Sequence, residues 1–302
     1  MHDLRLFQHF VFHAYPPLPI RGDTVWKEVA KLSHNFDFLI HAMLGLAASH
    51  LSMSNMTDFS SEALSHRVRA IKLLNTALSK PCSSKAEADA RFATIMALTF
   101  QSSYMPEGMV EFLVMLRGCT VVSDSALMCL EESVFAGFTA DTHNERVLSL
   151  NPDDVVDVQY VELLRGGLDS IVGMRPICQS ILQVRYLILL ERILKLGQGS
   201  PVSAFTEMCM SYSIFGQVGD DEFKYLTDSE NHASQIILIH FFVIEYILAT
   251  VALRPVIEKF PFRRTIVSAW TRDIAQRLPF DYEQYIRWPL EFVNSSRLKQ
   301  LC

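Results

Sequence analysis

The sequence predicts an all-α protein. Apolar residues recur at helical spacing through most of the 302 residues, whereas the alternating pattern of β-strands is nearly absent. Twelve glycines and twelve prolines are few for this length, which disfavours a turn-rich all-β protein. No Ser/Gly-rich linker, composition shift or internal repeat divides the chain. We therefore expect a single large domain over residues 1–302, with about twelve helices around a buried central helix pair.

The two central helices are predicted where apolar residues cover nearly every helical face. In residues 36–51, 11 of 16 residues are apolar, and in residues 236–253, 15 of 18 are. The second segment is also long enough to cross a bilayer. However, His240 and Glu245 lie within it, and an ionised group at the centre of a membrane costs roughly 2.5–3.5 kcal/mol. We therefore expect a buried core helix and a chain that does not span a membrane.

Local signals place the other helices. Leu64, Val68, Ile71, Leu74 and Leu78 form one apolar stripe, which predicts an amphipathic helix that ends before the proline at position 81. A capping-box pattern then begins a helix that ends near position 106, with Ser84 and Glu87 as its two members. Similar patterns predict further helices at about 3–14, 23–33, 109–123, 125–136, 153–172, 176–197, 201–213, 262–278 and 281–294.

Composition excludes several classes of protein. The formal charge of −6 supplies no overall basic face for nucleic acid, and the 50% hydrophobic content excludes intrinsic disorder. The six cysteines form neither a C-x-x-C pair nor a compact disulfide framework, so we expect most of them to be reduced core residues. The N-terminus lacks the pattern of a secretory signal. These observations favour an intracellular, soluble protein.

Motifs for catalysis or metal binding are weak. Asp153, Asp154 and Asp157 form a D-D-x-x-D pattern, which holds Mg²⁺ in terpene cyclases. The same residues also fit the start of a helix, with Asn151 as the cap and Pro152 in the first turn, and the second metal motif of those enzymes is missing. Hydrolase and nucleotide-binding motifs are absent from the sequence, and no third ligand joins the histidines at positions 34 and 41. We expect neither a metal nor a cofactor.

Polar residues inside apolar helices are the remaining candidates for a site. A buried polar group needs a partner, because leaving it unpaired costs roughly 1–3 kcal/mol. Pairing within the protein is the simpler interpretation, and lining a ligand cavity is the functional alternative. With 12 methionines and 20 phenylalanines, the chain suits either a plastic core or an adaptable apolar pocket. On the second interpretation the ligand-binding candidates are His41, Leu44, Phe100, Arg117, His240, Phe241 and Glu245.

Several segments, taken in order, resemble one known family. The chain is similar to the α-helical regulatory domain that follows the binuclear zinc cluster in fungal six-cysteine transcription factors, in particular those of the sterol uptake control type. The segments that carry this likeness cover almost the whole chain and include a Leu-Arg-Gly element at 116–118; they are residues 3–10, 25–26, 38–51, 112–118 and 270–289.

This resemblance implies a helical domain that can dimerise and that responds to a hydrophobic ligand such as a sterol, a terpenoid or a polyketide. The family's DNA-binding cluster needs six closely spaced cysteines, but here they are spread from Cys82 to Cys302, so we expect no direct DNA contact from this chain. Either an N-terminal segment has been removed or the chain is a stand-alone relative. The leading hypothesis is a ligand-responsive transcription regulator linked to sterol or secondary metabolism.

The alternative hypothesis is a stand-alone pocket protein that acts as a cofactor-free cyclase or isomerase on a terpenoid or polyketide. A closed apolar pocket accelerates such reactions by holding the substrate in a reactive conformation, and this mechanism leaves no nucleophile motif in the sequence. Both hypotheses require helices that enclose an apolar space large enough for a small lipid.

Overall fold

Regular structure in the chain is helical throughout the residues that the computed structural model describes, which are 2–17, 22–55, 57–105, 108–126, 133–151 and 153–295. No strand occurs in these ranges, so the predicted all-α class is confirmed. The chain divides into two compact units, unit 1 (Met1–Thr142) and unit 2 (His143–Cys302). The expectation of one domain over residues 1–302 stays a prediction.

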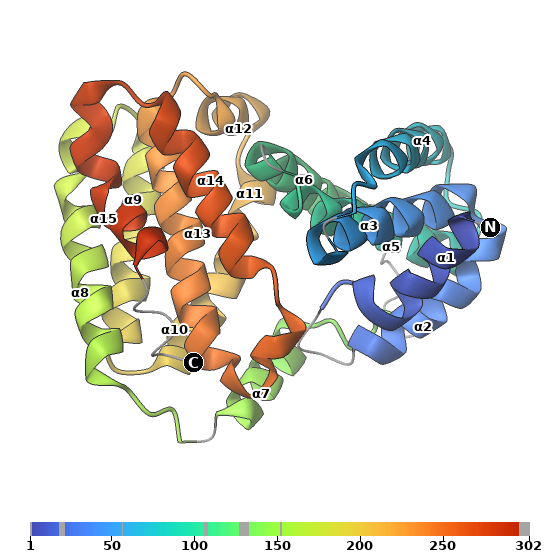
Figure 1. The fold of residues 1–302 in the computed structure, drawn as a ribbon, viewed down its shortest axis with the longest axis horizontal. Coiled ribbons are helices and arrows are strands. Elements are labelled where there is room, and N and C mark those ends of the chain that lie inside the picture. The colour runs from blue at the N-terminus through green and yellow to red at the C-terminus, as the bar shows by residue number, and fades with distance from the viewer. Residues whose placement is uncertain are drawn as a thin grey trace. The chain divides into compact units, whose positions relative to one another are not determined.

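Unit 1 is built around helix α3 (Asp37–Asn55), which packs against α1, α4 and α5 (Figure 1). Most of α3 is buried, as the sequence predicts, and many of its inward residues are small. A Cβ at Gly45 would lie 3.3 Å from the Ala63 carbonyl oxygen, so this glycine lets α3 and α4 approach closely. The other elements of unit 1 are α1 (His2–His9), a π-helical turn (Phe10–Ala14), α2 (Gly22–Leu32), α4 (Ser60–Leu78), α5 (Lys85–Ser103) and α6 (Gly108–Ala126).

Unit 2 surrounds helix α13 (His232–Ala252), the second of the two expected central helices (Figure 1). This helix is long and apolar enough to cross a membrane, but 94% of its most apolar window is buried within the protein. Such burial agrees with the expected core helix. The helices packed against α13 include α8 (Val158–Gly173), α9 (Ile181–Gly197), α10 (Pro201–Ser211), α12 (Asp220–Thr227), α14 (Arg263–Arg277) and α15 (Glu283–Asn294).

A pair of glycines fixes the contact between α8 and α15. A Cβ at Gly167 would lie 2.8 Å from Cζ2 of Trp288, and one at Gly166 would lie 3.1 Å from its Nε1. The indole therefore lies directly against the backbone of α8. Its ring also stacks on His240 of α13, with the ring centroids 5.7 Å apart.

The predicted orientation of α4 is wrong. Leu64 and Val68 of the expected core stripe are 56% and 58% exposed, and only Leu74 of that stripe is fully buried. The face that meets the core instead carries small residues and one arginine, namely Ala63, Arg67, Ala70 and Leu74. This face is buried because its small side chains allow α4 to lie close to α3. Arg67 can be buried with them because it donates hydrogen bonds to residues of α5.

Three predicted boundaries also change. The break predicted at 137–152 contains α7 (Ala140–Leu150), and the helix predicted at 125–136 lies partly outside the described residues, with 133–137 forming turns. The helix expected from 153 begins at Val158, where the Asp157 carboxylate accepts hydrogen bonds from the first-turn backbone. The predicted Asn151 cap is therefore wrong, and Pro152 lies outside the described residues.

The predicted N-cap of α5 is confirmed, but the predicted capping box is not, because the Glu87 carboxylate accepts from the backbone nitrogen of Ser83 and not of Ser84. Ser84 and Ser200 accept hydrogen bonds from the first turns of α5 and α10, as their positions before each helix predict. Helix α9 ends at Gly197, close to its predicted end, and it begins with a capping box at Ser180. The region predicted as a break at 214–233 contains two further short helices, α11 (Ile214–Gln217) and α12.

Candidate ligand groove

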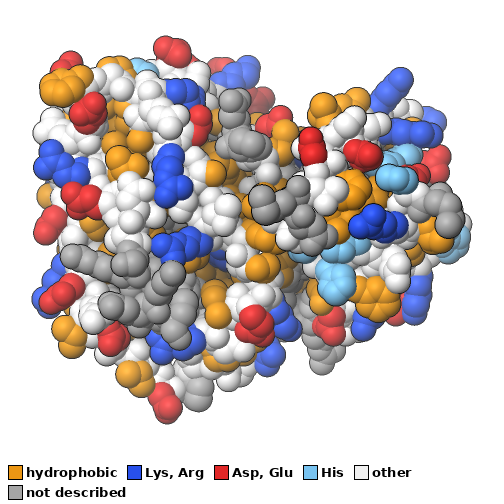
Figure 2. Space-filling view, in the orientation of Figure 1, with side chains coloured by type: hydrophobic (Ala, Val, Ile, Leu, Met, Phe, Trp, Pro, Cys, Tyr) orange, Lys and Arg blue, Asp and Glu red, His pale blue; other side chains and the backbone are white. Residues whose placement is uncertain are grey.

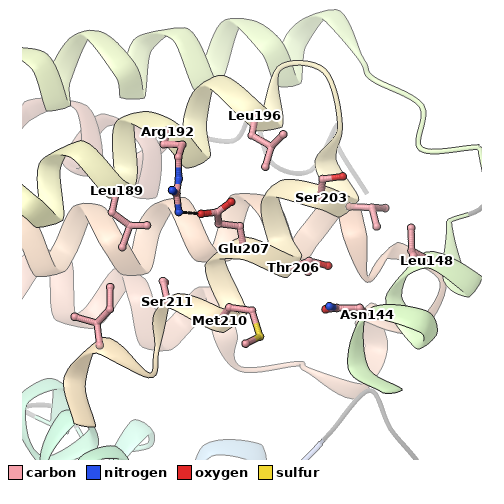
Figure 3. A pocket seen from close by; sticks show the side chains of 12 residues that line it. Asn144, Leu148, Leu189, Arg192, Leu196, Ser203, Thr206, Glu207, Met210 and Ser211 are labelled. Atoms are coloured by element: carbon pink, nitrogen blue, oxygen red, sulfur yellow. Dashed lines mark hydrogen bonds and ion pairs between the residues drawn. The ribbon is translucent and has the colours of Figure 1, made fainter. Parts of the chain in front are cut away.

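A groove of about 580 Å³ lies within unit 2, between α7, α9 and α10 (Figure 3). This volume is in the range of ligand-binding clefts. Leu148 of α7 and Met210 of α10 are 54% and 46% exposed, which makes the rim of the groove apolar. The lining residues are Asn144, Leu148, Leu189, Arg192, Leu196, Val202, Ser203, Thr206, Glu207, Met210, Ser211 and Ile214.

The sequence order of α9 and α10 explains why this groove forms. Gly197 ends α9, and Ser200 with Pro201 begins α10 after a tight turn, so the two helices run back along each other. Their inner sides pack on α13, while the outward sides of both helices remain open to solvent between Leu189 and Met210. The groove is therefore open along its surface, unlike the enclosed space that the sequence predicts.

Two polar features lie in the groove. The Arg192 guanidinium donates to the Glu207 carboxylate across α9 and α10 (Figure 3), and the largely exposed arginine side chain makes this a surface ion pair worth at most about 1 kcal/mol. The Oδ1 atom of Asn144 is buried and has no hydrogen-bond partner in the described part of the chain. An unpaired buried acceptor costs about 1–3 kcal/mol, which a ligand hydroxyl would recover.

The predicted site residues of unit 2 lie on α13, and none of the three belongs to the lining of this groove. His240 is fully buried, its Nδ1 donates to the Ile236 carbonyl oxygen at 2.8 Å, and its Nε2 accepts from Ser170 Oγ at 2.8 Å. Burial lowers the pKa of His240 to about 4, although the bond to Ile236 acts in the opposite direction. The ring is therefore neutral at pH 7.

Glu245 and Phe241 have partners within unit 2. The Glu245 carboxylate accepts a charge-assisted hydrogen bond from Arg263 of α14. Phe241 packs edge-on against Tyr212 and Phe215, with centroid distances of 5.1 and 5.4 Å. These contacts support the simpler interpretation of the polar residues, in which they join helices within the core.

The predicted site residues of unit 1 are distributed over three helices. His41 of α3 is half-buried, and its Nδ1 lies 2.8 Å from Nδ1 of His66 on α4. Leu44 is buried in the core of unit 1, Phe100 packs against that core from α5, and Arg117 is half-buried on α6. Of these four residues, His41 pairs with a second histidine on the neighbouring helix α4.

Histidines gather on unit 1, as Figure 2 shows on the face that it draws. His9 Nε2 lies 3.0 Å from His50 Nδ1, and the His9 and His13 rings are 5.3 Å apart. Burial, together with the charges of His9 and His13, lowers the pKa of His50 to about 4. No group of three or more His, Cys, Asp or Glu side chains in the described ranges could hold a metal ion.

The aspartates of the D-D-x-x-D pattern hold helix termini. Asp157 caps α8, and the Asp154 carboxylate accepts from Ser200 Oγ and from the Val202 backbone nitrogen at the start of α10. Asp154 adopts a φ of 43° to reach them. These two carboxylates are thus committed to structure, which favours the structural interpretation of the pattern over magnesium binding.

A buried arginine is the main feature of unit 1 that sequence reasoning missed. Arg67 is 4% exposed and donates to the Leu98 carbonyl oxygen at 3.0 Å, Ser102 Oγ at 2.8 Å and Glu111 Oε2 at 2.8 Å. It thereby joins α4 to α5 and α6. Gln101, 1% exposed, extends this network by donating to the Ala63 carbonyl oxygen. The sequence offers one signal for this burial. Arg67 lies on the same face of the helix as the small residues Ala63 and Ala70, which pack against the core.

The first comparison with known proteins concerns unit 1. Residues 4–127 match the family model described as the fungal specific transcription factor domain. The match covers most of unit 1, and the family resemblance drawn from the sequence is thereby confirmed for this part of the chain. Unit 2, with its groove, lies outside the matched residues.

A curated relative points in the same direction. Over 104 residues, the chain is 30% identical to Sterol uptake control protein 2 of Saccharomyces cerevisiae (strain ATCC 204508 / S288c). The aligned part is 33% of this chain and 11% of that protein, so the chain matches only about a tenth of its relative's length. No solved structure matches the chain significantly.

Proposed function

We propose that the chain is a regulatory part of a fungal transcription-factor-like protein, and that the groove of unit 2 binds the small hydrophobic molecule that controls it. The matched domain in residues 4–127 supports the regulatory role. The groove supports the ligand, because its apolar rim and its volume of about 580 Å³ suit a molecule of small-lipid size. This groove is the single observation on which ligand binding depends.

The proposed ligand class is a sterol-like, terpenoid or polyketide molecule with at least one hydroxyl group. The name of the yeast relative concerns sterol uptake, which favours sterols as the first compounds to test. The hydroxyl group would donate to Asn144 Oδ1, which lacks a partner, while the apolar skeleton lies along Leu189, Leu196 and Met210. Under this proposal the chain acts in the nucleus, and ligand occupancy controls its entry there.

Thermal unfolding of the full chain tests the proposal. A ligand at 100 times its dissociation constant adds about 2.7 kcal/mol, which raises the melting temperature by about 5 °C or more. We expect such a shift with at least one of ergosterol, a hydroxylated terpenoid or an aromatic polyketide. The absence of a shift with all of them contradicts the proposal.

A pair of matched variants locates the binding site. Leu148→Arg places a charge on the rim of the groove and should abolish the ligand-induced shift. Val155→Arg makes the same change at an exposed position of unit 2 that does not line the groove, and it should keep the shift. Equal shifts in the two variants would place the ligand elsewhere.

The enzyme alternative stays a prediction, because no observation singles out a reacting group in the groove. Incubation of the protein with a terpenoid or polyketide precursor, followed by mass spectrometry, tests it. A new isomer at the expense of the precursor would support the alternative.

A further inference from the structure

Helix α1 is attached to unit 1 through a small buried surface. It spans eight residues, of which Leu6 is fully buried. The π-helical turn that follows adds Phe10, which is fully buried and meets the Trp26 ring edge-on, with the ring centroids 5.8 Å apart. An element that buries so few side chains separates more easily than the core helices, so its polar contacts determine how firmly it is attached.

Histidines supply a polar contact between α1 and α3. His9 Nε2 of α1 lies 3.0 Å from His50 Nδ1 of α3, and the His13 ring of the π-helical turn lies 5.3 Å from the His9 ring. A hydrogen bond between two imidazole rings needs one nitrogen to donate and the other to accept. While α1 is attached, the two nitrogens that meet therefore cannot both carry a proton. When α1 separates from α3, both nitrogens reach water and can be protonated.

The groups around these rings disfavour their protonation while α1 is attached. Burial lowers the pKa of His9, and the charges of His13 and Arg5 act in the same direction. The pKa of His50 is about 4, because burial and the charges of His9 and His13 all lower it. From α5, the Tyr104 ring faces His50 edge-on at 6.1 Å, and burial raises the pKa of this tyrosine, so it stays neutral. No carboxylate of the described residues changes the pKa of either ring.

A second histidine pair of unit 1 has carboxylates beside it. His41 Nδ1 of α3 lies 2.8 Å from His66 Nδ1 of α4, and Asp3 Oδ1 of α1 lies 3.6 Å from His66 Nε2. Burial and the charges of Arg69 and His66 lower the pKa of His41, but Asp37 and Asp3 act in the opposite direction. The Asp3 side chain is 68% exposed, so its attraction to a protonated His66 is screened and opposes the separation of α1 only weakly. This pair therefore provides a comparison for the first one.

We propose that the contact of His9 with His13 and His50, the histidine latch, holds α1 on α3 at neutral pH and releases α1 as the pH falls from 7 to 5. Release takes up protons, so acid favours the released state. The stabilising effect of the latch is complete above pH 6.5, the ordinary pKa of a histidine, and is lost as the pH falls toward 4. The latch lies within unit 1 and does not depend on ligand binding in the groove of unit 2.

Hydrogen–deuterium exchange of the full chain, followed by mass spectrometry, tests the latch. Exchange in residues 2–14 is measured at pH 7, 6 and 5 and corrected for the change of the intrinsic exchange rate with pH. We expect the released fraction of α1 to rise about tenfold or more between pH 7 and pH 5, because a histidine with a pKa of about 4 in the attached state takes up a proton on release over this range. Exchange in α13, measured in the same samples, reports the separate response of His240.

Two variants remove the titration of the latch but keep its capacity for hydrogen bonds. In His50→Gln and His9→Gln the amide can still bond across the contact and does not titrate, so each variant should lose most of the rise. His41→Gln makes the same change at another half-buried histidine of α3 and should keep the rise. Far-ultraviolet circular dichroism at pH 7 shows whether each variant is folded.

Three outcomes would overturn the latch. The first is a constant released fraction of α1 in the wild-type chain between pH 7 and pH 5, which decides the question even if a variant fails to fold. The second is an equal loss of the rise in His50→Gln and His41→Gln, which would assign the response to histidines in general. The third is a full rise in both His9→Gln and His50→Gln, which would place the acid-sensitive group elsewhere in unit 1.

Discussion

The two units bury a long central helix by different means. In unit 1, α3 turns Ala42, Gly45 and Ala47 toward its neighbours, and the polar network of Arg67 holds the surrounding helices. In unit 2, α13 carries large apolar residues on every face. Its polar group His240 bonds to Ser170 of α8 and stacks on Trp288 of α15, and Glu245 pairs with Arg263 of α14.

This difference shows that a buried charge and a buried neutral group are tolerated for different reasons. Arg67 is accommodated because several acceptors surround its guanidinium, including the Glu111 carboxylate. His240 is accommodated because it stays neutral, with both ring nitrogens bonded. Each mechanism predicts a different way to destabilise its unit.

Removal of the arginine should have the largest effect. In Arg67→Leu, the buried acceptors around Leu98 and Ser102 lose their donor, and we expect the free energy of unfolding to fall by about 3–5 kcal/mol. Chemical denaturation measures this change. Arg69→Leu, an exposed neighbour on the same helix, is the control and should change stability by less than about 0.5 kcal/mol. A loss below 1 kcal/mol in Arg67→Leu would show that the network is not stabilising.

Acidification should destabilise unit 2 through His240. Its pKa in the folded protein, about 4, lies below the ordinary 6.5, so the unfolded chain binds the proton more tightly. Stability is therefore unaffected by this group above pH 6.5 and falls as the pH drops from 6.5 toward 4, by about 3 kcal/mol in total. His240→Asn should lose this part of the pH dependence, whereas His13→Asn, at an exposed histidine of unit 1, should keep it. Parallel pH profiles for wild type and His240→Asn would contradict the assignment.

Filling the glycine contact with Trp288 should have a moderate effect. In Gly167→Ala, the added Cβ would lie 2.8 Å from the indole, and overpacking of this kind costs about 1–3 kcal/mol. Thermal unfolding measures the loss, and the near-ultraviolet circular dichroism of Trp288 should change with it. A variant as stable as the wild type would mean that α15 shifts freely on α8.

The smallest expected effect is a gain in unit 1. Gly118 lies inside α6, where a Cβ would meet only Ile95 at ordinary contact distance, 3.6 Å. Alanine is a better helix former than glycine by about 1 kcal/mol, so Gly118→Ala should raise the free energy of unfolding by up to that amount. Gly173→Ala makes the same change at the last residue of α8, where a Cβ would meet no other atom within 4 Å, and its effect on stability provides the comparison. Destabilisation by Gly118→Ala would show that α6 needs the space.

Helices and caps could be predicted because their signals are local. The buried helices α3 and α13 follow from runs of apolar residues, and the caps at Ser84 and Ser200 follow from side chains that reach the next turn. The orientation of α4 could not be predicted in this way. Its most apolar side is not its most closely packed side, because Ala63 and Ala70 allow a shorter distance to α3 than leucines would.

In the candidate site, too, local patterns could be read from the sequence but the tertiary arrangement could not. Sequence reasoning chose polar residues on apolar helices, and His240 and Glu245 proved to be internally paired. The groove residues Leu148, Thr206 and Met210 carry no signal of their own, because a groove depends on what the neighbouring helices leave uncovered.

The sequence by itself determined that the chain is helical, which segments are buried, and which family its first part resembles, because periodicity and caps act over a few residues. Only the tertiary structure decided the division into two units, the inward turn of Arg67, the open groove and the exposure of Leu64 and Val68 on α4. These features depend on contacts between residues far apart in the chain, where side-chain size and hydrogen-bond geometry determine which face of a helix is covered.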